Sequence, residues 1–303
     1  MYKTQLHWQP ITILLILSLI WGANNAMIKI GALELPPLFM AGLRSLVASL
    51  CLYAWMKIKG VRLFPSKIVC LHGIVIGLFF ALEFGFIYVG LNYTLASRVY
   101  ILVYTAPFFT ALGAHFFLIG DRLNPWKTAG LILAFTGIIA LFMEDLGSFS
   151  LNALPGDMMA LASGLIWGSE TVYIKKYLVH RIVPLQTLFY EVFFSTPLLL
   201  LTSIVLEEQP ILSGLSISTV FSLFYQCIII AFLSFLVWFH LVHRYSVSLL
   251  HAFSFFTPVF GVFLSGALIL GEEMSSSLIV SLILVCLGLV FANYRPKAKP
   301  SLP

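Results

Sequence analysis

The segment Leu19-Ile-Trp-Gly-Ala-Asn-Asn-Ala-Met-Ile-Lys29 returns later in the chain as Leu165-Ile-Trp-Gly-Ser-Glu-Thr-Val-Tyr-Ile-Lys175. A second pair of matches follows in the same order. In the first half, Tyr104-Thr-Ala-Pro107 is followed by Gly120-Asp121. In the second half, Phe256-Thr-Pro258 is followed by Gly271-Glu272, and the number of residues from proline to glycine is the same in both halves. Two ordered matches predict an internal duplication, with residues 1–147 as the first repeat and residues 148–303 as the second.

The composition indicates that the bilayer is the solvent of this chain. Of its 303 residues, 60% are hydrophobic and only 10% are charged, and the mean hydropathy is +1.02. A hydrocarbon core of about 30 Å requires about 20 helical residues, and apolar segments of that size recur between short polar breaks. The sequence therefore predicts an all-α membrane protein with ten transmembrane helices, near residues 11–32, 37–57, 68–91, 96–118, 125–143, 155–178, 184–206, 218–241, 247–269 and 276–294.

The charges between these segments predict the orientation, because cytoplasmic loops are enriched in Lys and Arg. With the N-terminus inside, every basic residue except Lys29, Arg44 and Arg98 falls on an inner segment. The charged residues of the outer links are all acidic, namely Glu34, Glu144, Asp145, Glu207, Glu208, Glu272 and Glu273. Both termini are predicted to be cytoplasmic. The net charge of +5 therefore reflects membrane topology and does not indicate nucleic-acid binding.

Each predicted repeat contains five helices, an odd number, so the two repeats must cross the membrane in opposite directions. Inverted repeats of this kind are typical of secondary transporters, which bind their solute between the halves near the midplane. The four cysteines lack disulfide or metal-ligand spacing, and no cofactor or metal site is expected.

The same residues resemble those of EamA-type transporters, in the drug/metabolite transporter superfamily. The similarity covers nearly the whole chain and is strongest in Ile20-Trp-Gly22, in Tyr93 to Pro107, and in Ser248 to Glu272. It implies an inner-membrane carrier that exports a small organic solute, such as an amino acid or an organic cation, without naming the solute. The sequence contains no ATPase motif. Uphill transport would therefore use an ion gradient, and proton antiport is the coupling we expect.

Glu170 is the acidic residue nearest the predicted midplane, and the repeat alignment places it opposite Asn24 and beside Asn25. A carboxylate at this depth could bind an ammonium group, or could exchange a proton for a cation, because the membrane interior disfavours its ionised form. Its alternative role is structural, as a protonated side chain that hydrogen-bonds a neighbouring helix.

Further ionisable residues lie within the predicted helices. Arg44 and Glu83 lie at similar depth and are predicted to pair, either as a structural ion pair or with a role in gating or substrate binding. Glu191 is the repeat counterpart of Arg44, and His251 and His240 lie where they could meet it as an inner gate. Gating or coupling roles are thus predicted for Arg44, Glu83, Arg98, Glu191 and His251, although Arg98 could also extend to the membrane surface.

Aromatic and proline residues complete the predicted site. Trp21 and Trp167 precede Asn24 and Glu170 by three residues, on the same helix face. Together with Tyr100 and Tyr104 they could line an aromatic cavity, or could simply pack. Pro107 and Pro258 hold matching repeat positions and are predicted to bend their helices as hinges.

Two other classes of membrane protein remain as alternatives. A membrane-embedded enzyme acting on a lipid-linked substrate would need a catalytic motif, and the chain carries no HExxH, GxSxG or P-loop. His240 and His243 form an HxxH at a helix end, which is a weak metal signal. A channel is less compatible with inverted halves. The sequence leaves the oligomeric state open, with a monomer possible.

Overall fold

The structure is a computed structural model that describes residues 6–94, 96–143, 151–207, 210, 212–264 and 276–294. The side chains of Asn25, Ala96, Ser97, Tyr100 and Val262 are not described. Several charged residues used in the topology prediction lie outside the described residues, namely Lys3, Glu144, Asp145, Glu208, Glu272, Glu273, Arg295, Lys297 and Lys299. The second Gly-Glu match, Gly271-Glu272, also lies outside them.

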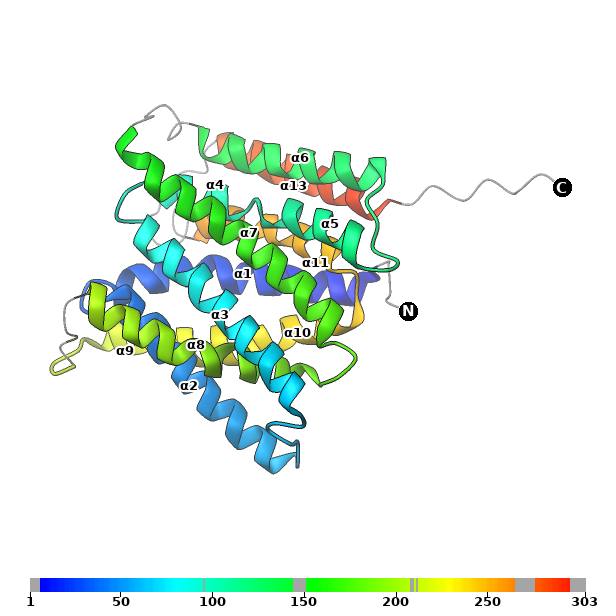
Figure 1. Ribbon diagram of the computed structural model, residues 1–303. Coiled ribbons are helices and arrows are strands. Elements are labelled where there is room, and N and C mark those ends of the chain that lie inside the picture. The colour runs from blue at the N-terminus through cyan, green and yellow to red at the C-terminus, as the bar shows by residue number, and fades with distance from the viewer. Residues whose placement is uncertain are drawn as a thin grey trace.

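All regular structure in the described ranges is helical (Figure 1). The first half contains α1 (Trp8–Gly31), α2 (Pro37–Ile58), α3 (Lys67–Gly90), α4 (Ala96–Val103), α5 (Ala106–Phe117) and α6 (Pro125–Leu141). The second half contains η2 (Leu151–Ala153), α7 (Leu154–Tyr177), α8 (Pro184–Leu206), α9 (Ile217–Phe224), η3 (Tyr225–Ser234), α10 (Phe235–Arg244), α11 (Val247–Ala252), η4 (Phe253–Phe255), α12 (Phe256–Phe263) and α13 (Ser276–Asn293). The described part of each predicted range is therefore mainly helical, and residues 265–269 of the ninth range lie outside the described residues.

Length and apolar composition qualify six helices of the described chain as membrane spans: α1, α2, α3, α8, α13 and the continuous Ile217–Arg244. Three shorter apolar stretches accompany them, at Ile101–Phe117, Pro125–Leu141 and Val247–Gly261. Helix α7 has 24 residues but carries Asp157, Glu170, Lys175 and Lys176, which make it less apolar. Some of these polar side chains face the interior of the bundle, and others lie toward the ends of the helix.

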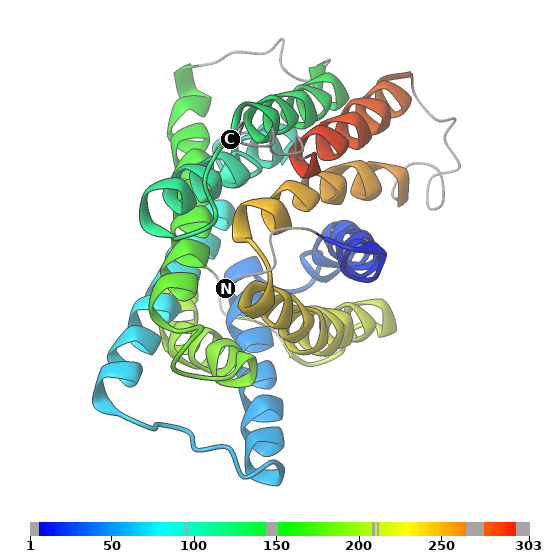
Figure 2. The same cartoon turned by 90° about the vertical axis from the view of Figure 1, so that its right-hand side faces the viewer.

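The helix packing repeats between the two halves. Helices α2 and α8, which hold equivalent positions in the predicted repeats, pack against each other, and so do α6 and α13. Helix α7 packs on α5, and its counterpart α1 packs on α12; Figure 2 shows the blue α1 beside the orange segment. Likewise α3 packs on α8, and η3 packs on α2. The bundle is therefore assembled by exchange of equivalent contacts between the halves.

Small residues allow the closest of these contacts. A Cβ atom added to Gly130 of α6 would lie 2.4 Å from the backbone of Gly288 and Ala292, and one added to Gly288 of α13 would lie 2.5 Å from the Ala134 amide. Glycine permits this close approach because it places no side chain at the crossing. In α1, Gly22 meets the α12 backbone in the same way, 2.7 Å from the Gly261 amide.

Two predicted helices are interrupted near their centres. The range 96–118 is divided at Tyr104 and Thr105 into α4 and α5, with Pro107 in the first turn of α5. The range 247–269 passes through α11, η4 and α12, with Pro258 in the first turn of α12. Proline has no amide hydrogen to donate, so both breaks follow from the matched prolines. Their action as hinges stays a prediction.

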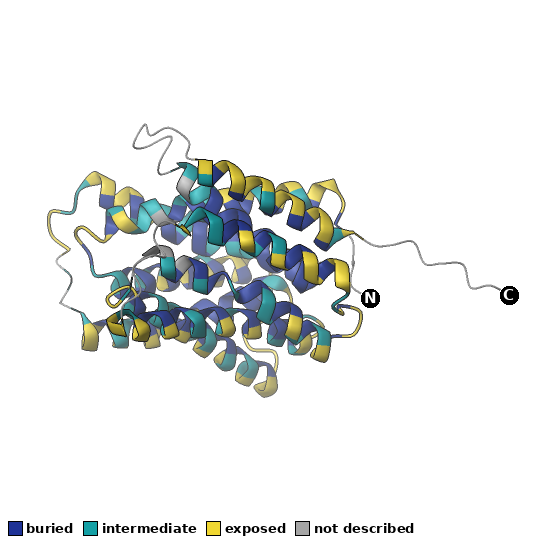
Figure 3. Ribbon diagram, turned by 90° about the horizontal axis from the view of Figure 1, so that it is seen from above, coloured by how far each residue is buried: buried dark blue, intermediate teal, exposed yellow. Residues whose placement is uncertain are grey.

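Buried residues lie between the helices, and exposed residues lie on the outward faces (Figure 3). Many of those outward residues are large and apolar, including Leu50 at 59% exposure, Phe116 at 70% and Val290 at 67%. Water would penalise such a surface, whereas hydrocarbon accepts it. The first turn of α1 and the last turn of α13 lie at the same end of the bundle (Figure 1).

Candidate functional site

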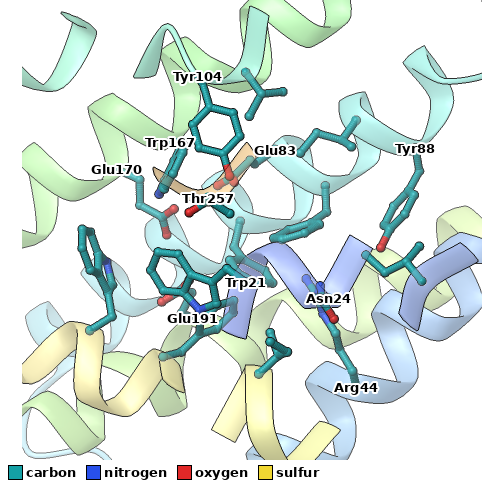
Figure 4. Close-up of a pocket in the computed structure, with 18 of the residues that line it drawn as sticks. Trp21, Asn24, Arg44, Glu83, Tyr88, Tyr104, Trp167, Glu170, Glu191 and Thr257 are labelled. Carbon is teal, nitrogen blue, oxygen red and sulfur yellow. The ribbon is translucent and has the colours of Figure 1, made fainter. Parts of the chain in front are cut away.

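A cavity of about 310 Å³ lies inside the bundle, between the two halves. Its walls come from α1, α2, α3 and α4 of the first half and from α7, α8, η3, α10 and α12 of the second. Figure 4 shows 18 of the side chains that line it and labels ten of them. The structure brings together eight predicted site residues on this wall: Trp21, Asn24, Arg44, Glu83, Tyr104, Trp167, Glu170 and Glu191.

Three carboxyl groups from three helices line the cavity. Glu83 of α3, Glu170 of α7 and Glu191 of α8 are all buried, with Glu170 only 3% exposed. Oε1 of Glu170 and Oε2 of Glu191 have no hydrogen-bond partner. A buried polar atom without a partner is costly, so such atoms at a cavity wall mark positions where a ligand, water or proton can bind.

The only guanidinium in the cavity wall belongs to Arg44 of α2. The predicted direct pair between Arg44 and Glu83 is not formed, because no ion pair within 4.0 Å joins these two described side chains. The guanidinium instead lies over the ring of Phe84, 4.0 Å from its centroid. Its Nε and Nη2 atoms have no hydrogen-bond partner. The Phe84 ring packs against the charged guanidinium and interacts favourably with it, but it supplies no anion.

Aromatic side chains form much of the remaining wall. Trp21 donates a hydrogen bond from Nε1 to Ser234 Oγ at 2.9 Å, and its ring meets Trp238 edge-on with centroids 5.4 Å apart. Tyr104 and Trp167 make a second edge-on contact at 6.0 Å. Trp21 therefore has a fixed orientation, because one hydrogen bond and one ring contact hold it from the opposite half.

His251 lies behind the wall and does not meet Glu191. Its Nε2 atom hydrogen-bonds Thr171 Oγ1 at 2.9 Å, and its ring packs between Trp167 and Trp238 at 4.9 and 5.3 Å. His240 is exposed and bonds the Leu236 carbonyl of its own helix. The predicted cluster of Glu191 with these two histidines is therefore wrong in its contacts, and His251 supports two tryptophans instead.

Arg98 is not among the residues that line the cavity. Arg98 forms an ion pair with Asp157 of α7, and Thr94 donates to the same carboxylate at 2.7 Å. Asn25 and Tyr100 have undescribed side chains, and Asn24 has an Oδ1 atom without a partner. Each proline lies close in sequence to a lining residue, since Tyr104 precedes Pro107 and Thr257 precedes Pro258.

Several lining residues escaped the sequence analysis. The wall also includes Tyr88, Phe84, Phe235, Trp238 and Thr257. None of them is charged, and the first four have no matched repeat position that would separate them from packing residues. Only Thr257 gave a signal, because it lies within the Phe256-Thr-Pro258 match.

The two ends of the bundle differ. The cavity wall extends to Lys29 and Leu91, which are exposed at the ends of α1 and α3. At the opposite end, Asp121 accepts hydrogen bonds from Lys127 Nζ at 2.9 Å and from the Ser248 backbone amide at 3.1 Å. Lys127 also donates to Ser248 Oγ at 2.9 Å. We refer to Asp121, Lys127 and Ser248 as the Asp121 network.

The charge of Asp121 is stabilised within this network. Burial alone would raise the pKa of its carboxyl group, but the Lys127 ammonium and the hydroxyl groups of Ser248 and Ser246 outweigh burial, and the pKa lies below its usual value. The network therefore holds the link between α5 and α6 against the start of α11 as a charged, hydrogen-bonded contact.

An apolar helical bundle whose two halves enclose a cavity with buried charges defines a multi-pass membrane transport protein. The model of the EamA-like transporter family matches this chain twice, at residues 8–143 and 154–294. The chain belongs to that family. It is an inner-membrane protein, and the two matches correspond to its two halves.

Named relatives cover almost the full chain. The transporter YoaV of Bacillus subtilis is 27% identical over 91% of this chain and 93% of its own length. A probable amino-acid metabolite efflux pump of Salmonella typhimurium is 29% identical over 91% of each chain. A solved crystal structure superposes with a TM-score of 0.79 at 22% identity, over 93% of this chain and 95% of its own, which shows a shared fold.

Proposed function

We propose that the protein is a secondary active exporter of a small organic metabolite, such as an amino acid, and that it works by alternating access coupled to protons. The observation that carries this proposal is the cavity between the halves, where Glu170 is buried and its Oε1 atom has no partner. A carrier needs a solute site near the midplane that can be reached from one side at a time. The cavity wall reaches exposed residues at one end, and the Asp121 network lies at the other.

The proposed topology has ten crossings, with both termini in the cytoplasm. The six long spans, the three shorter apolar stretches and α7 together support this number. Lys57, Lys67, Arg122 and Arg244 are at the end of the bundle where α1 begins, as expected for the cytoplasmic side. The Asp121 network would then close the cytoplasmic end, and the cavity would be reached from outside.

The proposed coupling assigns the proton to the carboxyl groups of the cavity. Three carboxyl groups in one enclosed apolar site cannot all carry charge cheaply, so a proton held there can be exchanged for a cationic group. Glu170 is the primary candidate, because it lies on α7 of the second half, which contacts α3, α4 and α5 of the first half. A movement between the halves would therefore change its surroundings. The Salmonella relative's name, which refers to amino-acid metabolite efflux, supports this class of solute.

Export of organic cations is the second candidate. Three carboxyl groups beside Trp21, Trp167 and Trp238 would also suit an aromatic or quaternary ammonium solute. An enzymatic role has less support, since the relatives are named as transporters.

The test is uptake of labelled amino acids and organic cations into proteoliposomes under an imposed pH gradient. Wild type is compared with Glu170→Gln, which keeps the size of the side chain, and with Glu34→Gln, a matched change of an exposed carboxylate outside the cavity. We expect saturable flux in wild type, unchanged pH dependence in Glu34→Gln, and loss of pH dependence in Glu170→Gln. Unchanged pH dependence in Glu170→Gln would exclude its role in coupling, and absence of flux for every solute would exclude the carrier.

A further inference from the structure

Arg44 is one of the most deeply buried side chains of the protein. It is 1% exposed, it lines the cavity, and its Nε and Nη2 atoms lack hydrogen-bond partners. Within the described chain, no carboxylate lies within 4.0 Å of its guanidinium. The guanidinium lies over the ring of Phe84, 4.0 Å from its centroid.

Glu83 and Glu191 line the same cavity but make no direct ion pair with Arg44, so its positive charge has no contacting counter-ion. An arginine stays ionised in proteins, and removing such a charge from water costs several kcal/mol unless an anion and hydrogen bonds replace the water. A cation–π contact recovers only about 0.5–2 kcal/mol. The missing anion can come from the cavity, since the guanidinium faces it.

The opposite charge lies across the cavity. Figure 4 shows Glu170 and Arg44 well apart around the same space, with Trp21 between them in this view. Glu170 also presents an unpartnered atom, Oε1. A cavity of about 310 Å³ thus offers a cationic group at one place, a carboxyl group at another, and an aromatic wall. A solute that carries both charges would satisfy both groups at once.

We propose that Arg44 binds the carboxylate of the solute and makes the carrier select zwitterions over simple organic cations. This inference rests on the proposed transport function and decides between its two candidate solute classes. The guanidinium can donate two parallel hydrogen bonds to a carboxylate, which a lysine ammonium cannot reproduce. An amine without a carboxylate leaves Arg44 uncompensated and is rejected for that reason.

The test uses solutes that differ in one group. Leucine and phenylalanine are each compared with their amides and with the amines that lack the carboxylate, in wild type, Arg44→Gln and Arg44→Lys. Lys57→Gln serves as the matched control, because Lys57 is on the same helix as Arg44 but is exposed and lies outside the cavity wall. We expect wild type to prefer the amino acids, and Arg44→Gln to lower their kcat/KM by roughly 10- to 100-fold with little effect on the amines. Arg44→Lys should keep part of the preference, and Lys57→Gln should keep all of it.

A binding measurement separates failure of this inference from failure of transport. Trp21, Trp167 and Trp238 line the cavity, so intrinsic fluorescence of the purified protein reports solute binding without flux. Binding of amino acids that depends on Arg44, in the absence of flux, would support the inference and overturn the carrier proposal. Equal loss of amino-acid and amine transport in a folded Arg44→Gln, or a wild-type preference for the amines, would overturn the inference. If Arg44→Gln fails to fold, the same comparison in Arg44→Lys decides.

Discussion

Asp121 joins the two halves of the bundle, because its carboxylate accepts the backbone amide of Ser248 at 3.1 Å while Lys127 neutralises it at 2.9 Å. Asp121 is in the link between α5 and α6, and Ser248 is in the first turn of α11. The contact is buried, with Asp121 2% exposed. An alternating-access carrier would have to break this contact each time the cytoplasmic end opened.

Asp121→Asn is expected to favour opening of this end. The amide still accepts a hydrogen bond but leaves the Lys127 ammonium without its counter-ion, and disrupting a buried pair costs about 3–5 kcal/mol. The measurement is the labelling rate of a cysteine at Leu250, a fully buried position of α11, in a background without the native cysteines. We expect labelling to rise at least about tenfold. Glu34→Gln at the opposite end is the control, and equal rates in both variants would contradict the assignment.

The Asp121 network should not respond to pH between 5 and 8. A carboxyl group whose pKa is lowered on folding stabilises the folded state above its unfolded pKa, here near 3.8, and this contribution is lost only as pH falls through the lower folded value. Labelling at Leu250→Cys should therefore stay flat from pH 5 to 8. Any pH dependence of flux in that range would then originate outside the Asp121 network. A labelling rate that changes within the range would show that the network itself titrates.

The helices and much of the site could be predicted from the sequence, for identifiable reasons. Span length, charge position and the Trp-Gly repeat are local or periodic signals, and the described part of each predicted range is mainly helical. One cavity is lined by Glu170, Glu191 and Arg44, because charged groups within apolar helices must face the interior, and Trp21 lines the same cavity.

Side-chain contacts were less predictable. Arg44 and Glu83 lie at the same depth, but depth does not fix rotation about the helix axis, and Phe84 covers the guanidinium instead. His251 turns toward Thr171 because α11 packs beside α5 and α7, a long-range contact with no sequence signal. Tyr88 and Trp238 resemble ordinary packing residues in the sequence, and only the assembled bundle shows them at the cavity.

Gly130 and Gly288 are predicted to hold α6 against α13. Alanine at Gly130 would place a methyl group 2.4 Å from Gly288 and Ala292 backbone atoms, and overpacking of this kind costs about 1–3 kcal/mol. Gly130→Ala and Gly288→Ala should both lower the midpoint of thermal unfolding in detergent. Gly85→Ala on α3 is the matched control, because no atom lies within 4 Å of its added Cβ, and helix propensity favours alanine. A similar decrease in Gly85→Ala would exclude packing as the cause.

The hydrogen bond from Trp21 to Ser234 is predicted to set the affinity for the solute. Trp21→Phe keeps an aromatic ring in the wall but removes the donor, and Ser234→Ala removes the acceptor. A hydrogen bond of this kind contributes about 1 kcal/mol, so each change should raise KM roughly fivefold. The double variant should be no worse than either single variant, because both remove the same bond. Trp55→Phe controls for loss of an indole, since Trp55 packs on Phe232 outside the cavity wall. Additive effects in the double variant would mean that the two residues act on the solute independently.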